Sequence, residues 1–233
     1  MSKIIAFGNQ KGGVGKTTCT VLVANSLSQS PFNLNIIVID IDKQKSLSTA
    51  RELDLDYYEK PAPYKILSLD IETFEREIRN LDKTNDIILI DTGGRLDKDN
   101  LSQELILAYC DFLFIPFVSG NYNLDSSLDY LKFVLNIQSR RSSSSRKLNI
   151  IGFINKYRAR SKARRQLSEE IEDLKKVANI DFMRNNLNDY SLFSEIDTYE
   201  NIYNENASPI REKASLNFSV WLSELFRVIT NKQ

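Results

Sequence analysis

The stretch Gln10-Lys11-Gly12-Gly13-Val14-Gly15-Lys16-Thr17-Thr18 decides the fold of this chain. It follows an apolar run at residues 4–7 that is typical of a buried strand, and it precedes residues 19–27, whose apolar spacing predicts a helix. A glycine-rich loop between a strand and a helix can turn its backbone N–H groups around a triphosphate, and the helix adds its positive amino-terminal end. The stretch therefore predicts a phosphate-binding loop, in which Lys16 reaches the β- and γ-phosphates and Thr17 ligates Mg²⁺. The alternative is a glycine turn of an ordinary α/β protein.

Two features distinguish this loop from the usual phosphate-loop pattern. Gln10 stands where that pattern has glycine, and a second lysine, Lys11, lies too far round the loop to share the phosphate contact of Lys16 easily. In these residues the segment resembles the deviant phosphate loop of the ParA/MinD family of deviant Walker-type ATPases, in the form of the ParA branch. The resemblance implies that Lys11 acts in trans, on ATP held by a second, facing subunit; a solvated surface lysine is the alternative. It also implies that the ATP-binding residues include Lys11, Gly12, Gly13, Val14, Gly15, Lys16, Thr17 and Thr18.

Two carboxylates end the next predicted strand. Residues 33–40 contain a continuous apolar run of the kind found in strands covered on both faces, and Asp40-Ile41-Asp42 follows. Period-two spacing points Asp40 and Asp42 the same way, at the sheet edge where an open parallel sheet places its site. The segment resembles the second acidic motif of the ParA family, with Lys43 in place of a proline. The resemblance implies that Asp42 positions the hydrolytic water and that Asp40 supports the water shell of the metal; an acidic strand end in solvent is the alternative.

A third carboxylate, Asp91, ends the apolar run at residues 87–90. This is the expected form of a Walker B site, in which Asp91 holds Mg²⁺ through water. Thr92-Gly93-Gly94 follows, whereas many ParA relatives carry prolines there. A buried strand that ends in aspartate is common by chance, and the phosphate loop upstream favours the functional interpretation.

A possible base-reading motif follows the predicted strand at residues 148–154. Asn155-Lys156-Tyr157-Arg158 resembles the guanine-reading Asn-Lys-x-Asp of GTPases, but Arg158 stands where the purine-pairing carboxylate should be. Guanine therefore loses its discriminating partner. In MinD-like relatives an asparagine at this place contacts adenine, so the resemblance implies that Asn155 binds the base of ATP.

A basic cluster follows directly, with six Lys or Arg among the ten residues 156–165, and an acidic cluster lies at 169–173. One interpretation is a patch that contacts DNA phosphates without reading bases. The other is a solvated helix with ion pairs four residues apart. The candidate DNA-binding residues are Arg158, Arg160, Lys162, Arg164 and Arg165.

Length and composition bound the remaining possibilities. A chain of 233 residues, 42% of them hydrophobic, suffices for one well-buried α/β core, so we expect a single phosphate-loop ATPase domain over residues 1–233. The formal net charge is zero, which excludes a uniformly basic nucleic-acid binder. The chain has no histidine, so its chemistry depends on carboxylates, lysines, a metal and water. The isolated Cys19 and Cys110 are expected to be reduced core residues of a cytosolic protein.

The predicted elements alternate along the chain. Further strands are expected at 66–69 and 112–118, and helices at 46–53, 70–81, 100–110, 121–137 and 209–230, with a surface loop at 54–63. Together with the resemblance, this alternation predicts an α/β, three-layer P-loop NTPase fold with a central, mostly parallel twisted sheet flanked by helices. No apolar run approaches the ~18 residues of a membrane span, and the early first strand leaves no room for an amino-terminal DNA-reading module.

The resemblance implies a small ParA-like plasmid or chromosome partition ATPase, cytoplasmic and nucleoid-associated, with ATP and Mg²⁺ as cofactors. Such a protein forms a homodimer around two ATP molecules and binds nonspecific DNA in that state. A centromere-bound, ParB-like adaptor then stimulates hydrolysis, which is otherwise slow, and releases it. No membrane partner is expected, because the closing helix has few cations beside its apolar face. The alternatives are a MinD-like membrane-cycling regulator, a positioning ATPase for a non-DNA cargo, and an electron donor like the nitrogenase iron protein.

Overall fold

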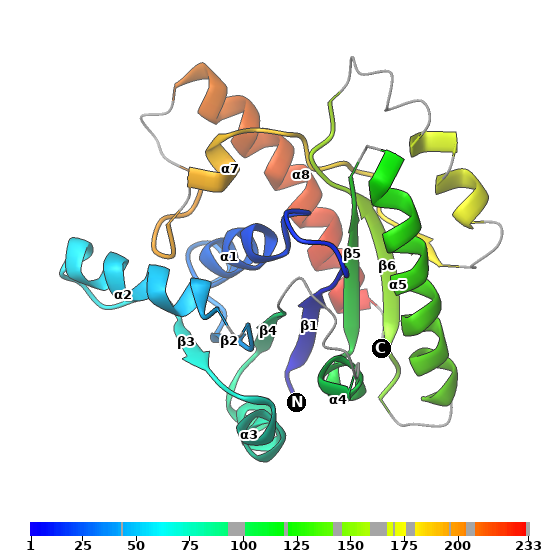
Figure 1. Cartoon of the computed structure of the whole chain (residues 1–233). Coiled ribbons are helices and arrows are strands. Elements are labelled where there is room, and N and C mark those ends of the chain that lie inside the picture. The colour runs from blue at the N-terminus through cyan, green and yellow to red at the C-terminus, as the bar shows by residue number, and fades with distance from the viewer. Residues whose placement is uncertain are drawn as a thin grey trace.

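The computed structural model shows a central parallel sheet with helices on both faces (Figure 1). It describes residues 1–42, 44–92, 101–118, 121–141, 146–158, 167–169, 171–175, 180–195, 197–203 and 208–231, with no side chains described at 121–127. Within these residues the strand order is β3-β2-β4-β1-β5-β6-β7, and every neighbouring pair is parallel. The strands are β1 (Lys3–Phe7), β2 (Ile36–Asp40), β3 (Lys65–Ser68), β4 (Ile87–Asp91), β5 (Phe112–Phe117), β6 (Asn149–Ile154) and β7 (Asp181–Phe182).

Helices cover the sheet in two outer layers, which confirms the three-layer prediction (Figure 1). One layer contains α1 (Lys16–Leu27), α7 (Leu192–Glu195) and α8 (Pro209–Asn231), and the other contains α3 (Ile71–Thr84), α4 (Leu101–Tyr109) and α5 (Asn121–Arg140). The strands alternate between the layers: Ile5 and Phe7 of β1 pack on the first, whereas Ile4 and Ala6 pack on the second. The continuous apolar runs in the sequence reflect this two-sided burial.

The closing helix α8 packs on the sheet, as its apolar positions predict. Trp221 is fully buried, with its ring centroid 6.4 Å from that of Phe7 and 5.2 Å from that of Phe153. Phe218 and Leu225 of the same helix are also fully buried. The last helix therefore completes the core beside β1 and β6.

Several helix boundaries differ from the prediction by a few residues, and two of the differences concern the start of α1 and the end of α2. Helix α1 begins at Lys16 rather than at residue 19, so the phosphate loop leads directly into it. Helix α2 (Ser46–Tyr58) continues through residues 54–58, for which the sequence predicts a surface loop. That prediction is wrong because the polar side chains there have distant partners: Asp54 accepts hydrogen bonds from Thr198, and the Tyr58 hydroxyl donates to Asp197.

Candidate nucleotide-binding site

The phosphate loop lies at the edge where the parallel strands end. In the sheet register Asp91 at the end of β4 pairs with Phe7, the last residue of β1, and with Asp40, the last residue of β2. The loop after β1 therefore begins level with both carboxylates. This is the edge at which open parallel sheets bind ligands.

The backbone of the loop has the features of an anion cradle. Gly13 and Gly15 adopt φ angles of 74° and 93°, which a residue with a side chain rarely adopts, and Gly15 also caps α1. In the described part of the chain, the backbone N–H groups of residues 13–17 have no hydrogen-bond acceptor. Unpaired N–H groups at the start of a helix favour an anionic ligand. The loop therefore fits the phosphates of a nucleotide.

Lys16 adds a buried positive charge to this cradle. Its ammonium donates a hydrogen bond of 3.2 Å to the carbonyl of Lys11, and the residue is only 6% exposed. Burial lowers the pKa of the Lys16 ammonium, and the negative charges of Asp91 and Asp42 act against that shift. A buried ammonium is costly without a counter-charge, so an anionic ligand beside Lys16 would be favourable.

Thr17 and Asp91 form the part of the site that could hold a metal. The Thr17 hydroxyl lies 2.9 and 3.1 Å from the two Asp91 carboxylate oxygens. The pKa of Asp91 is raised to about 7, mainly by burial. The hydrogen bond from Thr17 acts against this rise, and the negative charge of Asp40 adds to it. The described residues include no group of three or more His, Cys, Asp or Glu side chains that could hold a metal. Mg²⁺ commonly uses one or two protein oxygens together with water and substrate phosphates, and Thr17 and Asp91 fit that pattern.

Asp40 and Asp42 have different surroundings. Asp40 is fully buried, and its carboxylate accepts hydrogen bonds from the Ser48 amide and hydroxyl at 2.9 and 2.8 Å. It also accepts a 3.1 Å bond from the amide of Asp42. Asp40 thus fixes the turn that leads into α2 and so places Asp42. Asp42 is half-buried and accepts a bond from the amide of Gln44, which leaves its carboxylate nearer to solvent.

Lys11 lies at the entrance of the loop. Its amide donates to the Asn9 side chain at 3.0 Å, and its carbonyl accepts from Lys16. The residue is half-buried. Its expected contact with a facing subunit involves a second chain and stays a prediction.

Asn155 and Lys156 lie against the outside of the loop. The side-chain amide of Asn155 donates to the Val14 carbonyl at 2.7 Å, and the Lys156 ammonium donates to the Gly13 carbonyl at 2.9 Å. The resemblance implies that Asn155 binds the base, whereas Lys156 has no role predicted from sequence. The sequence did contain a signal for Lys156, because it follows the end of the predicted strand together with Asn155.

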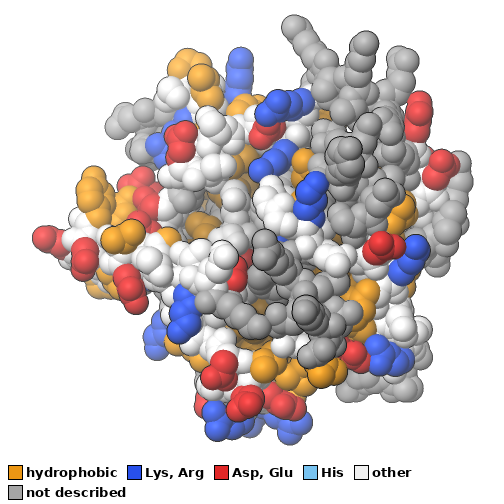
Figure 2. Space-filling model, viewed as in Figure 1, with side chains coloured by type: hydrophobic (Ala, Val, Ile, Leu, Met, Phe, Trp, Pro, Cys, Tyr) orange, Lys and Arg blue, Asp and Glu red, His pale blue; other side chains and the backbone are white. Residues whose placement is uncertain are grey.

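The basic cluster is described only at its start. Arg158 forms an ion pair of 2.5 Å with Asp189, and Arg160, Lys162, Arg164 and Arg165 lie outside the described residues. Figure 2 shows basic side chains around the phosphate loop and acidic side chains over α2. Basic and acidic side chains therefore gather at different places on this face of the molecule.

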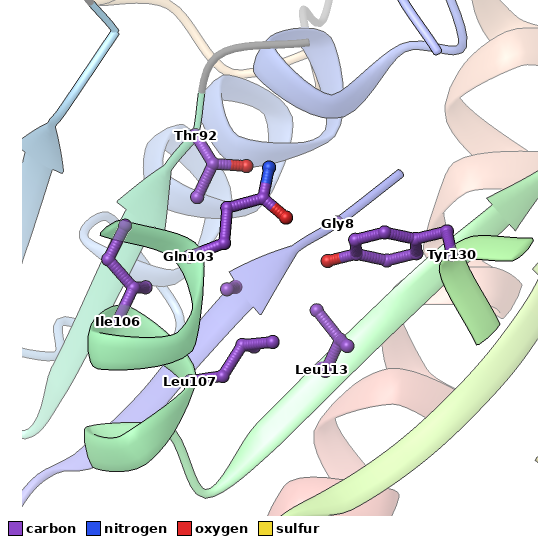
Figure 3. Close-up of a pocket in the computed structure, with 8 residues that line it drawn as sticks. Gly8, Thr92, Gln103, Ile106, Leu107, Leu113 and Tyr130 are labelled. Carbon is purple, nitrogen blue, oxygen red and sulfur yellow. The ribbon is translucent and has the colours of Figure 1, made fainter. Parts of the chain in front are cut away.

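A narrow apolar pocket lies beneath the start of the loop (Figure 3). Its lining includes Gly8, Thr92, Gln103, Leu113 and Tyr130. A Cβ atom at Gly8 would lie 2.2 Å from the Tyr130 hydroxyl, so this position requires glycine. The pocket is too narrow for a water molecule and therefore belongs to the packing under the loop.

Both cysteines are fully buried. Burial raises the pKa of each thiol to about 12, so neither is a ready metal ligand. This burial disfavours a cluster shared between the cysteines of two subunits. No helix within the described ranges has the length and apolar character needed to cross a membrane.

Several known sequences match parts of this chain. An AAA domain family model matches residues 2–73. The sporulation initiation inhibitor protein Soj of Bacillus subtilis is 30% identical over 132 residues, which cover 57% of this chain and 46% of Soj. The maintenance of carboxysome distribution protein A of Halothiobacillus neapolitanus is 26% identical over 170 residues, covering 73% of this chain and 74% of the relative. An uncharacterized Mycobacterium tuberculosis protein is 40% identical over 58 residues, and the chain spans only 17% of its length.

Comparison with solved structures covers the whole fold. The Aquifex aeolicus cell division protein MinD has a TM-score of 0.66 at 16% identity, covering 100% of this chain and 98% of its own. The ATP complex of a Cyanothece McdA variant has a TM-score of 0.67 at 16% identity, with 96% of both chains covered. pNOB8 ParA bound to nonspecific DNA has a TM-score of 0.60 at 19% identity, with both chains fully covered. The resemblance of this chain to the ParA/MinD family of deviant Walker-type ATPases is therefore confirmed, by sequence over part of the chain and by fold over its length.

Proposed function

We propose that residues 1–233 form a single ParA-like ATPase domain that binds and slowly hydrolyses ATP with Mg²⁺. The observation that carries this proposal is the cradle at residues 13–17, which combines backbone N–H groups that lack an acceptor among the described residues with the buried Lys16. Thr17 and Asp91 lie within 3.1 Å of each other beside it. Anion-binding backbone, a cation and metal-ligating oxygens thus meet at one end of the sheet.

Each residue of the site has a distinct proposed role. Lys16 neutralises the β- and γ-phosphates, Thr17 ligates Mg²⁺, and Asp91 holds the metal through water. Asp40 supports that water shell indirectly, because its own oxygens are bonded to Ser48 and Asp42. Bound MgATP would supply the γ-phosphoryl group and the divalent charge needed for hydrolysis.

Asp42 is the proposed residue for orienting the attacking water. It follows the buried Asp40 by two residues, and its charge reaches the Lys16 ammonium electrostatically. No histidine competes for this role, since the chain has none.

The proposed active form is a homodimer in which Lys11 contacts the ATP of the facing subunit. Only the triphosphate completes that contact, so dimerisation would report the bound nucleotide. The dimer would bind nucleoid DNA nonspecifically through Arg158, Arg160, Lys162, Arg164 and Arg165. A ParB-like adaptor would stimulate hydrolysis and release the protein, which would then be cytoplasmic.

A positioning ATPase for a non-DNA cargo is the second candidate. The alignment with the carboxysome distribution protein, over 73% of this chain, specifically favours it. A MinD-like membrane cycle is less compatible with α8, because Trp221, Leu222 and Leu225 are buried against the sheet.

The test is size-exclusion chromatography with light scattering, using ADP or a slowly hydrolysed ATP analogue, with and without nonspecific duplex. We expect dimers only with the ATP analogue and a DNA complex only of that dimer. Lys11→Ala should bind the nucleotide but stay monomeric, and Lys16→Ala should not bind it. A chain that stays monomeric with every nucleotide would refute the proposed cycle. Dimers that do not bind DNA but sediment with liposomes would favour the MinD-like alternative. Dimers that bind neither DNA nor liposomes would favour a non-DNA cargo.

A further inference from the structure

We propose that Asn155 and Lys156 are positioning residues that hold the phosphate loop in its binding shape. On this view the Asn-Lys pair acts on the phosphates, through the loop, whatever base the nucleotide carries. The inference rests on the nucleotide binding proposed above and goes beyond it, because it assigns a role to Lys156 and a different role to Asn155.

The two side chains hold consecutive carbonyl groups of the loop. Lys156 donates to the Gly13 carbonyl at 2.9 Å, and Asn155 donates to the Val14 carbonyl at 2.7 Å. Asn155 is 4% exposed, and a Cβ atom at Gly15 would lie 2.5 Å from its amide nitrogen. The end of β6 and the loop are therefore in close contact at this point.

The geometry of the peptide bond converts these contacts into an orientation of the loop amides. In a planar trans peptide the carbonyl of one residue and the N–H of the next point in opposite directions. When Lys156 and Asn155 hold the carbonyls of Gly13 and Val14 toward β6, the N–H groups of Val14 and Gly15 must point away from it. Those N–H groups belong to the set without acceptors among the described residues. The pair thus presents two donors to a phosphate before the ligand arrives, which lowers the ordering cost of binding.

The Asn155-Lys156 pair is itself held rigidly. The backbone N–H of Asn155 donates to the Phe117 carbonyl at 2.8 Å, which continues the pairing of β5 with β6. Lys156 has a φ of 51°, a left-handed conformation that lysine rarely adopts without support. The support follows at once, because the Tyr157 amide donates to the Leu187 carbonyl at 3.0 Å.

That support extends to α8. Asn217 of this helix accepts from the Asn188 amide at 2.9 Å and donates to the Asn186 carbonyl at 2.9 Å. Such a frame fixes the backbone from which the Lys156 side chain reaches the loop. The frame therefore suits Lys156 to a positioning role.

A ligand without a base separates this inference from base recognition. Inorganic tripolyphosphate with Mg²⁺ engages the loop amides but offers no adenine. If the pair positions the loop, removing either side chain weakens ATP and tripolyphosphate binding by the same factor. If Asn155 acts on the base instead, only ATP binding weakens.

The experiment measures both dissociation constants by titration calorimetry on the full chain. We expect Lys156→Met to weaken both ligands roughly tenfold, since a charge-assisted hydrogen bond is lost, and Asn155→Ala to weaken both several-fold. Lys156→Arg keeps a donor and should recover most of the affinity. Lys83→Met is the matched control, because this exposed lysine lies in the last turn of α3, before β4 begins, and should leave both constants unchanged.

Unfolding midpoints without ligand identify any variant that has lost its fold. If Lys156→Met or Asn155→Ala is unfolded, the dissociation constants of the other variant test the inference. A loss confined to ATP, or unchanged tripolyphosphate binding in Lys156→Met, would overturn the inference. If the unaltered chain bound neither ligand, the proposed function would fall, and this inference with it. If the unaltered chain bound both ligands and Lys156→Met bound them with unchanged dissociation constants, only the inference would fall.

Discussion

Replacing Asp91 with asparagine should stabilise the ligand-free protein above pH 7 while removing its activity. The carboxyl group of Asp91 is 1% exposed at the end of β4. Burial is the main cause that raises its pKa from 3.8 to about 7, against the opposing hydrogen bond from Thr17. Between these two values the folded protein keeps a proton that the unfolded chain has released. Folding stability must therefore fall as the pH rises from about 4 to about 7, and then level off.

The size of this effect follows from the raised pKa. Each pH unit in that window costs about 1.4 kcal/mol, so the ionised Asp91 destabilises the empty site by about 4 kcal/mol at most. Asparagine cannot ionise and fills nearly the same volume, but its contact with Thr17 differs. We therefore expect Asp91→Asn to gain roughly 2–4 kcal/mol at pH 8 and progressively less toward pH 5.

The assay is urea unfolding at pH 5, 6, 7 and 8, with a chelator and without nucleotide. The difference between the two proteins reports Asp91 together with its electrostatic effect on the Lys16 ammonium, while the other titrating groups are common to both. Asp70→Asn provides a control whose effect should not depend on pH in this range. Asp70 caps α3 by accepting from the Thr73 amide at 2.7 Å, and this bond lowers the pKa of Asp70. Both the unfolded pKa of Asp70, 3.8, and its lowered folded pKa lie below pH 5, so the difference between that variant and the unaltered chain should stay constant from pH 5 to pH 8. Parallel pH profiles of Asp91→Asn and the unaltered chain would refute the reasoning.

Three further predictions concern other parts of the molecule. Asp42→Ala should keep nucleotide-dependent dimers but stop phosphate release, and normal turnover in a malachite-green assay would mean that another group orients the water. Arg146→Met should cost about 2–3 kcal/mol in urea unfolding, because it leaves the mostly buried Asp82 and Asp111 carboxylates without their cation; a smaller loss at high salt would show that solvent screens the network. Trp221→Ala should cost about 3–5 kcal/mol by leaving a cavity between α8 and the sheet, so an unchanged midpoint would contradict the packing described here.

The strands of this protein could be predicted from sequence because two-sided burial leaves continuous apolar runs. The run at residues 87–91 coincides with β4, and the run that ends at Asp40 contains β2. Their order in the sheet carries no such local signal. Nothing near residue 36 indicates that β2 lies between β3 and β4, since that order depends on how the helices cross the sheet.

Helix ends were less predictable where tertiary contacts decide them. Residues 54–58 have the acidic and polar character of a surface loop, yet Asp54 and Tyr58 are bonded to residues 197 and 198, about 140 positions away. The cap of α3, by contrast, needs only Asp70 and Thr73, and this helix starts within one residue of its predicted start. Local capping is visible in sequence, whereas contacts between distant segments are not.

The site shows the same division between local and distant information. The motif at residues 10–18 indicates which backbone groups are available for a phosphate, but the side chains that fix the loop come from other strands. Thr17 contacts Asp91 at the end of β4, and Val14 contacts Asn155, which directly follows β6. Because β1 lies between β4 and β5, and β6 follows β5, the sheet order itself brings both groups to the loop. A nucleotide that displaced Thr17 from Asp91 would leave the contacts at β6 in place. Thr17 could then exchange its contact with the Asp91 carboxylate for a contact with a metal, while the backbone N–H groups of the loop keep their direction.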